Sequence, residues 1–153
     1  MATTDAEQES WFVDTNILVY ASEPTAPLHA QAQQFLASAW ERGARLVVSP
    51  QVLREYLSVA SRWAQNEMGS RLDAALSNVR DLLQSLDVVE EGASTVERMV
   101  DLLRETPVYG KRIHDAQIVA TMLIHGLSRL LTNNPADFAR FGHLISIHTL
   151  ETK

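Results

Sequence analysis

The sequence of 153 residues contains no cysteine. This absence excludes disulfide bonds, catalysis by a thiolate, and zinc or iron–sulfur sites that are held by cysteine. It is typical of proteins of the reducing cytosol, which is where we expect this protein to act. Hydrophobic residues make up 46% and charged residues 21%, as in ordinary globular proteins. The length suits a single domain with one core.

Long apolar runs are also absent. No run approaches the roughly 20 residues of a membrane-spanning helix, so we predict no membrane segment. Residues 1–10 are polar and acidic and lack the basic and apolar parts of a signal peptide, so we expect a disordered lead-in there. The net charge of −6 argues against broad, sequence-independent binding of nucleic acid, although it allows a local basic rim around an acidic pocket.

Short apolar runs alternate with longer segments of helical periodicity. The runs predict strands over residues 11–13, 45–49, 87–89, 128–132 and 144–147. The periodic segments predict helices over residues 27–42, 50–65, 70–86, 94–105 and 113–125. Such alternation is typical of an α/β fold in which a parallel sheet is covered by helices on both faces, and we expect one domain over residues 11–150.

Four acidic residues follow predicted strands or begin predicted helices. Asp14 ends the first strand, Glu55 lies in the first two turns of the helix after the second strand, and Asp137 follows the fourth strand. Glu55 has an alternative role as a solvated residue near the positive end of its helix. Asp115 lies in the first turn of a helix that is apolar nearly all round, where a carboxylate is costly unless it is paired, protonated or bound to a metal.

These positions converge on one edge of a right-handed parallel sheet, the edge where ligands bind in such folds. Crowded carboxylates repel one another, and Mg²⁺ or Mn²⁺ would relieve the repulsion, because both ions prefer oxygen ligands. Two such ions about 4 Å apart can activate a water and stabilise the leaving oxygen of a phosphodiester. The pattern therefore predicts a metal-dependent nuclease site that contains Asp14, Glu55, Asp115 and Asp137.

Four segments also carry a family resemblance. Val13–Tyr20 (VDTNILVY), Leu53–Tyr56 (LREY), His114–Ala116 (HDA) and Leu131–Phe138 (LTNNPADF) resemble the motifs of PIN domains, and most closely those of VapC-type toxin ribonucleases of type II toxin–antitoxin systems. The resemblance spans Trp11 to Leu150. It implies a PIN-like three-layer α/β/α sandwich with a central, mainly parallel sheet. It also implies an endoribonuclease that depends on Mg²⁺ or Mn²⁺, forms a homodimer and is inhibited by a cognate antitoxin.

The resemblance assigns roles by matching positions. Asp14, Glu55 and Asp115 become metal ligands, and Asp137 becomes a further acid near a second metal. The supporting polar residues of the motifs are Asn16, Thr132 and Asn134. Asn134 stands where many relatives carry aspartate, so the choice between one metal and two stays open.

Basic residues lie near the same predicted edge. Arg54, Lys111 and Arg112 could contact RNA phosphates or be solvated surface residues. His114 could donate to a phosphate or an acid, or serve in packing.

Two other functions stay open beside the toxin ribonuclease: a housekeeping PIN nuclease of RNA processing, and a PIN-like protein-binding module without catalysis. The presence of all four acids counts against the binding module. The RNA target does not follow from the sequence.

Overall fold

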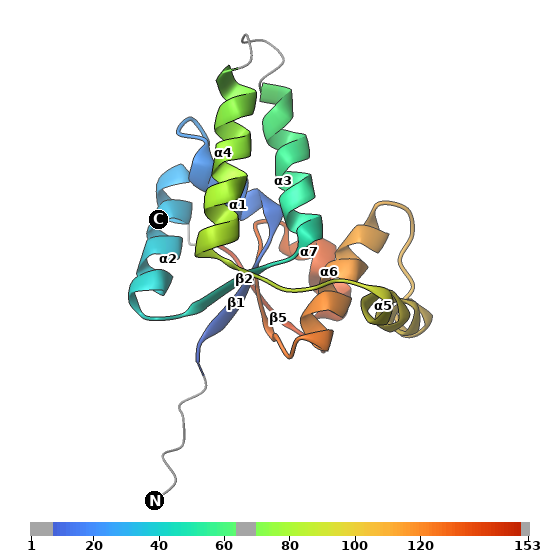
Figure 1. The fold of residues 1–153 in the computed structure, drawn as a ribbon. Helices are drawn as coiled ribbons and strands as arrows, with labels where there is room; N and C mark the ends of the chain where they lie inside the picture. The colour runs from blue at the N-terminus through green and yellow to red at the C-terminus, as the bar shows by residue number, and fades with distance from the viewer. Residues whose placement is uncertain (1–7, 64–69, 151–153) are drawn as a thin grey trace, which may run out of the picture.

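The computed structural model describes residues 8–63 and 70–150. Its centre is a five-stranded sheet in which every pairing is parallel and the strand order is β3-β2-β1-β4-β5 (Figure 1). The strands are β1 (Ser10–Val13), β2 (Arg45–Val48), β3 (Asp87–Val88), β4 (Arg129–Leu131) and β5 (Ser146–His148). The first strand of the chain therefore lies in the middle of the sheet.

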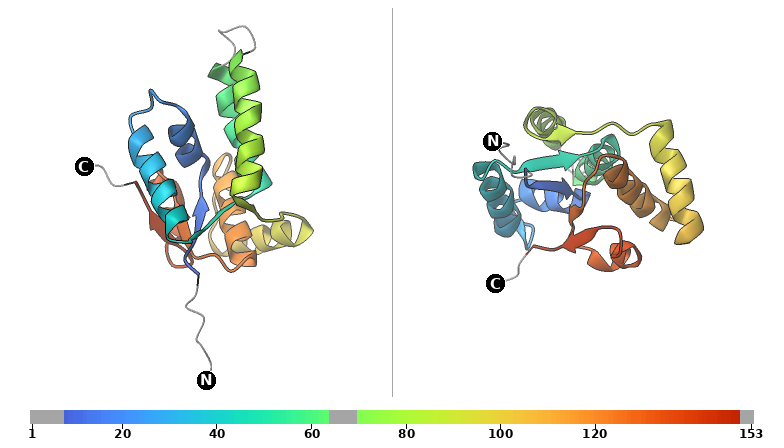
Figure 2. Two further views of the ribbon diagram at one scale, coloured as in Figure 1. Left: turned by 60° about the vertical axis from the view of Figure 1, so that its left-hand side comes forward. Right: turned by 90° about the horizontal axis from the view of Figure 1, so that it is seen from below.

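Helices cover both faces of this sheet. The helices of the described residues are α1 (Thr15–Ser22), α2 (His29–Glu41), α3 (Pro50–Trp63), α4 (Ser70–Ser85), α5 (Ala93–Glu105), α6 (Arg112–Ile124), α7 (Pro135–Phe138) and the short 3-10 helix η2 (Ala139–Phe141). Figure 2 shows α1 and α2 on one side of the strands and α5 and α6 on the other. The α3–α4 pair projects beyond the carboxyl ends of the strands (Figures 1 and 2). The predicted three-layer α/β/α sandwich with a parallel sheet is confirmed.

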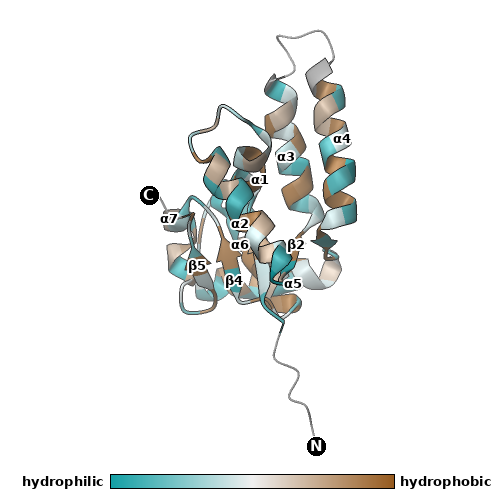
Figure 3. Cartoon of the chain, turned by 90° about the vertical axis from the view of Figure 1, so that its left-hand side faces the viewer, coloured by the Kyte–Doolittle hydropathy of each residue, from teal (hydrophilic) through white to brown (hydrophobic). Residues whose placement is uncertain are grey.

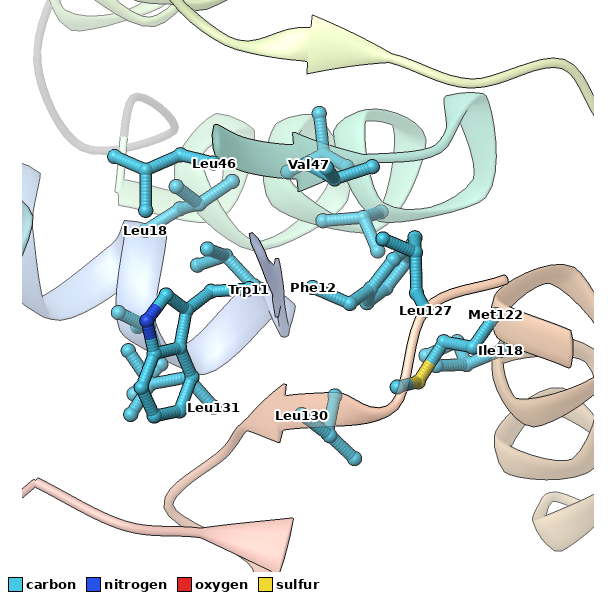
Figure 4. Packing of buried hydrophobic residues seen from close by; sticks show 14 of the residues in the cluster. Trp11, Phe12, Leu18, Leu46, Val47, Ile118, Met122, Leu127, Leu130 and Leu131 are labelled. Carbon is cyan, nitrogen blue, oxygen red and sulfur yellow. The ribbon is translucent and has the colours of Figure 1, made fainter. Parts of the chain in front are cut away.

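The core is built around β1. Phe12 and Val13 are fully buried, as predicted for a strand covered on both faces. In the sheet Phe12 lies beside Val47 of β2 and Leu130 of β4. Figure 4 shows the side chain of Phe12 pointing towards the side of the sheet where Met122 and Ile118 of α6 lie. Burial of this apolar surface is the main favourable term in folding.

Two helices end at glycines with positive φ, which lets the chain turn back into the sheet. Gly43 follows α2 with φ 74°, and Gly126 follows α6 with φ 68°. After α6, the Leu127 N–H donates to Met122 O (2.8 Å) and the Gly126 N–H to Leu123 O (3.3 Å). This is the Schellman arrangement, which needs the left-handed conformation that glycine adopts without steric cost.

The structure corrects several local predictions: α2 begins at His29 and not at residue 27, and three further differences have a visible physical basis. β5 begins at Ser146 and not at residue 144, because the N–H groups of Leu144 and Ile145 both donate to Phe141 O and so extend the preceding turn. α5 begins at Ala93, before residue 94, and the Thr95 hydroxyl accepts from the backbone N–H at the cap. Ser49 directly precedes Pro50, the first residue of α3, and this sequence predicts that the Ser49 hydroxyl caps the helix; instead the hydroxyl is buried without a hydrogen-bond partner among the described residues.

The helix α4 is less buried than its periodicity predicts. Leu72, Leu76 and Leu83 are exposed. The reason is that α4 packs mainly against α3 and not against the sheet. Figure 3 shows hydrophobic and hydrophilic residues alternating along both helices of the pair. The amphipathic pattern therefore predicts the helix correctly but not which of its leucines are covered.

The expected lead-in over residues 1–10 lies largely outside the described residues, which begin at residue 8. Ser10 already belongs to β1. The Glu9 carboxylate accepts hydrogen bonds from Trp11 Nε1 (2.8 Å) and Arg42 Nη2 (3.0 Å), so residues 9 and 10 are tied to the fold. No helix within the described residues combines the length and hydrophobicity that crossing a membrane requires.

Truncating the central aromatic residue of β1 should destabilise the protein strongly. We expect Phe12→Ala to lower the free energy of unfolding by roughly 3–5 kcal/mol, since it removes a fully buried ring and leaves a cavity. The control is Trp40→Ala on α2, where the side chain is 60% exposed and the expected change is within about 0.5 kcal/mol. Urea unfolding measures both, and equal effects of the two substitutions would contradict this account of the core.

Candidate functional site

The register of the sheet brings Asp14 and Thr132 together. Val13 pairs with Leu131, so the next residue of each strand stands at the same carboxyl edge. The Asp14 N–H donates to Leu131 O (3.0 Å), and the Thr132 hydroxyl donates to Asp14 Oδ2 (2.7 Å). Asp14 is also the N-cap of α1, where its Oδ1 accepts from the Thr15 N–H (2.8 Å). One carboxylate thus joins two strands and a helix.

Burial dominates the electrostatics of Asp14. The side chain is only 8% exposed, and desolvation raises the pKa of its carboxyl. The hydrogen bonds from Thr132 and Thr15 act in the opposite direction, because they stabilise the charged form. The negative charges of Glu55 and Asp137 raise the pKa further. These effects show that acids from three separate elements are close enough to interact.

Glu55 is held through both of its carboxylate oxygens. It lies in the second turn of α3, half-buried, above the carboxyl edge of the sheet. Oε2 accepts from the Thr15 hydroxyl (3.0 Å), and Oε1 accepts from Gln51 Nε2 (3.1 Å). Thr15 therefore connects Asp14, its chain neighbour, with the acid of α3.

Asp115 carries a strongly perturbed carboxyl group. It lies half-buried in the first turn of α6, as predicted. Burial raises its pKa to about 7, and the charges of Asp137, Asp14 and Glu55 contribute in the same direction, while Arg112 opposes them. Asp115 is therefore in electrostatic reach of each of the other three predicted acids.

Three of the four acids line a depression of about 560 Å³, here called the acidic depression. It is lined by Glu55, Lys111, Arg112, His114, Asp115 and Asp137. Two basic residues thus stand beside three acids, as the predicted local basic rim requires. Arg54 is not in this lining. Arg54 Nη2 lies 3.4 Å from Glu91 Oε1 in a neighbouring groove. This groove and the acidic depression share His114 in their linings. The contact of Arg54 with RNA therefore stays a prediction.

The supporting residues of the motifs differ in their contacts. The Asn16 amide donates to Asp14 Oδ2 and to the Thr132 hydroxyl (both 3.4 Å), and its Oδ1 accepts from the Asn133 N–H (3.1 Å). Asn134 is exposed, and it meets this network through its backbone N–H, which donates to the Thr132 hydroxyl (3.1 Å). Asn16 and Thr132 therefore orient Asp14 directly, whereas Asn134 acts through Thr132.

The donor set suits a divalent cation. Four carboxylates supply only oxygen ligands, which Mg²⁺ and Mn²⁺ prefer, and their repulsion is of the kind that a cation relieves. Within residues 8–63 and 70–150, however, no three acidic or histidine side chains are gathered closely enough to hold an ion as they stand. The chemistry of the donors fits, and holding an ion would require the acids to draw closer together.

Two further polar residues belong to this site, Thr15 and Gln51. Neither was among the site residues predicted from the sequence. Both donate to Glu55, and Gln51 Nε2 also donates to His114 O (2.9 Å). Their positions in the sequence could have indicated this role, because Thr15 follows Asp14 directly and Gln51 precedes Glu55 by one helical turn.

A comparison with known protein families identifies the family of this chain. Residues 11–144 match the sequence model of the PIN domain, a span that includes all four acids. The chain belongs to the PIN domain family. The predicted resemblance is therefore confirmed at the level of the family.

One curated relative matches part of this PIN domain. The chain is 38% identical over 73 residues to Ribonuclease VapC23 of Mycobacterium tuberculosis (strain CDC 1551 / Oshkosh), an alignment that covers 48% of this chain and 56% of the relative. The chain thus spans about half the length of the curated relative that it matches.

Solved structures extend the likeness to the whole fold. VapBC2 from Rickettsia felis, bound to a DNA fragment from its promoter, matches 93% of this chain and 99% of its own with a TM-score of 0.67 and 20% identity. A toxin–antitoxin complex from Klebsiella pneumoniae matches 93% and 98% with a TM-score of 0.63 and 24% identity. At these identities the structures show a shared fold.

Replacing Asp115 should change how the stability of this PIN domain depends on pH. A pKa raised from 3.8 to about 7 means that the folded protein binds the proton more tightly than the unfolded chain. The resulting stabilisation is complete below the unfolded pKa and is lost as the pH rises through 7. In EDTA at pH 8, we expect Asp115→Asn to be more stable than the wild type by about 2 kcal/mol, or roughly 4–8 °C in Tm.

The difference should shrink towards zero below pH 4, where the aspartate is neutral in both states. The control is Asp101→Asn on α5, an exposed acid outside the acidic depression, which should change Tm little at any pH. Calorimetric scans at pH 4, 6 and 8 make the comparison. A lower Tm of Asp115→Asn at pH 8 would contradict the assigned electrostatics.

Proposed function

We propose that this PIN domain is a metal-dependent endoribonuclease and the toxin of a toxin–antitoxin pair. The proposal rests chiefly on one observation: Glu55, Asp115 and Asp137 line one depression near the carboxyl edge of the sheet, and the charges of neighbouring acids raise the pKa of both Asp14 and Asp115. The relative named Ribonuclease VapC23 supports cleavage of RNA. The toxin–antitoxin complex that shares the fold supports the assignment to such a pair.

The four acids would hold Mg²⁺ or Mn²⁺, with Asp14 and Asp115 as direct ligands, Glu55 as a ligand or as the group that orients the attacking water, and Asp137 near a second ion. When bound, the ion activates a water and stabilises the leaving oxygen of the phosphodiester. Thr132 and Asn16 fix the Asp14 carboxylate, and Thr15 fixes that of Glu55. No side-chain nucleophile takes part, and the products are a 5′-phosphate and a 3′-hydroxyl.

Lys111 and Arg112 would hold the RNA backbone. Both are exposed and line the acidic depression beside Glu55, Asp115 and Asp137. Cationic side chains at this position offset the repulsion between the acids and the phosphates. Because the chain carries a net charge of −6, binding depends on this local basic rim.

A cognate antitoxin and a second copy of the chain are the proposed protein partners. The net charge of −6 suits an antitoxin that brings a basic side chain to the acids. Exposed Leu72, Leu76 and Leu83 on α4 offer apolar surface that a protein partner can cover. We assign the activity to the cytoplasm, where RNA and a co-expressed antitoxin are both present.

The decisive experiment is cleavage of total cellular RNA by the purified protein. We expect discrete products with Mg²⁺ or Mn²⁺, no products with EDTA, and a loss of roughly 100-fold or more in Asp14→Asn, which removes a charged ligand. Asp101→Asn should cleave like the wild type. Equal cleavage by wild type and Asp14→Asn would mean that the acids do not form the site. A folded, antitoxin-free protein that cleaves no RNA would favour the protein-binding module.

Metal binding should also appear as stabilisation of the folded protein. At an Mn²⁺ concentration of about 100 times Kd, a ligand that binds only the native state adds roughly 2.7 kcal/mol, which corresponds to about 5–10 °C in Tm for a chain of this size. Differential scanning fluorimetry with Mn²⁺ measures the shift. Asp14→Asn should lose most of it and Asp101→Asn should keep it, whereas identical shifts in both variants would show that Mn²⁺ binds elsewhere.

A further inference from the structure

Gln51 is a buried polar side chain with an incomplete set of hydrogen bonds. It is only 6% exposed, and its Oε1 has no partner among the described residues. An apolar side chain of similar size would avoid a buried carbonyl without a hydrogen bond. Stability alone therefore does not explain an amide at this position.

The NH₂ group of Gln51, in contrast, is fully used. One hydrogen bond goes to Glu55 Oε1 (3.1 Å), and the other goes to the backbone carbonyl of His114 (2.9 Å). Both acceptors lack a hydrogen to give. The reverse orientation of the amide would place its own oxygen against two oxygens, so the network fixes which way the amide points.

This amide joins two helices that carry acids. Gln51 and Glu55 lie one turn apart on α3, while His114 immediately precedes Asp115 in α6. The main packing partners of α3 are α1 and α4, and that of α6 is α5. The Gln51 amide therefore gives a direct link between the Glu55 carboxylate and the turn of α6 that bears Asp115.

We propose that Gln51 is a positioning residue, which holds the Glu55 carboxylate in register with the start of α6 and so with Asp115. Thr15 holds Oε2 of the same carboxylate from the side of α1 (3.0 Å), so that Glu55 is fixed between two donors from different directions. The inference rests on the proposed function, since it concerns the acids that would hold Mn²⁺. A carboxylate fixed in this way binds a metal without first losing side-chain freedom.

The test compares Gln51→Met with Gln117→Met in the full chain. Methionine has a similar length and no amide. Gln117 lines the same groove as Gln51 but makes no side-chain hydrogen bond to an acid among the described residues. Isothermal titration measures the Kd for Mn²⁺, RNA cleavage gives kcat and KM, and thermal unfolding in EDTA gives the Tm without metal.

We expect Gln51→Met to weaken Mn²⁺ binding by roughly tenfold or more and to lower kcat by a similar factor, with KM unchanged within about twofold. Its Tm in EDTA should equal or exceed that of the wild type, because the unpartnered carbonyl is gone. Gln117→Met should match the wild type in all three measurements. In a Glu55→Ala background, Gln51→Met should change the Kd for Mn²⁺ by less than about twofold, since its effect passes through Glu55.

Three outcomes would overturn the assignment. Gln51→Met could bind Mn²⁺ as the wild type does, it could weaken binding equally with and without Glu55, or its affinity loss could accompany a marked drop of the Tm in EDTA, which would reveal a purely structural role. A wild type that neither binds Mn²⁺ nor cleaves RNA is a separate result. It would refute the proposed function and leave Gln51 without a metal site to organise.

Discussion

A buried carboxylate at the end of the central strand is the constraint on which the rest of the site depends. Asp14 is charged only at a cost, because it is withdrawn from water. The hydroxyl of Thr132 and the N–H of Thr15 offset that cost. Both donors are in place only if β4 pairs with β1 in the observed register and α1 begins directly after β1. The hydrogen bonds that stabilise the Asp14 carboxylate therefore depend on the strand order and register of the sheet.

The region around Asp14 is arranged at the expense of stability. Burial and neighbouring charges raise the pKa of Asp115 to about 7, so ionising it near neutral pH opposes folding. The carbonyl of Gln51 and the hydroxyl of Ser49 are buried without partners among the described residues, each at a cost of roughly 1–3 kcal/mol. Such local conflicts are expected where a site is selected for its chemistry, and the apolar core around Phe12 and Val13 outweighs them.

The fold of this chain occurs in proteins whose sequences differ from it at most positions. The two structures described above share 20% and 24% of residues with this chain, yet each covers 93% of it with a TM-score above 0.6. A core tolerates extensive exchange of hydrophobic residues if volume and pattern are kept. The acids at the edge of the sheet are less replaceable than the core residues, because few other side chains supply a negative charge and oxygen ligands.

The sequence by itself determined the alternation of strands and helices and the parallel sheet, and it predicted that Asp14, Glu55, Asp115 and Asp137 lie towards one edge of that sheet. Periodicity is a local property, and the carboxyl ends of parallel strands always share an edge. Only the tertiary structure decided which donors hold these acids. Thr132 reaches Asp14 across 118 residues of sequence, and Gln51 reaches His114 across 63. Such contacts, like the exposure of the leucines of α4, depend on register and helix placement, which no local pattern encodes.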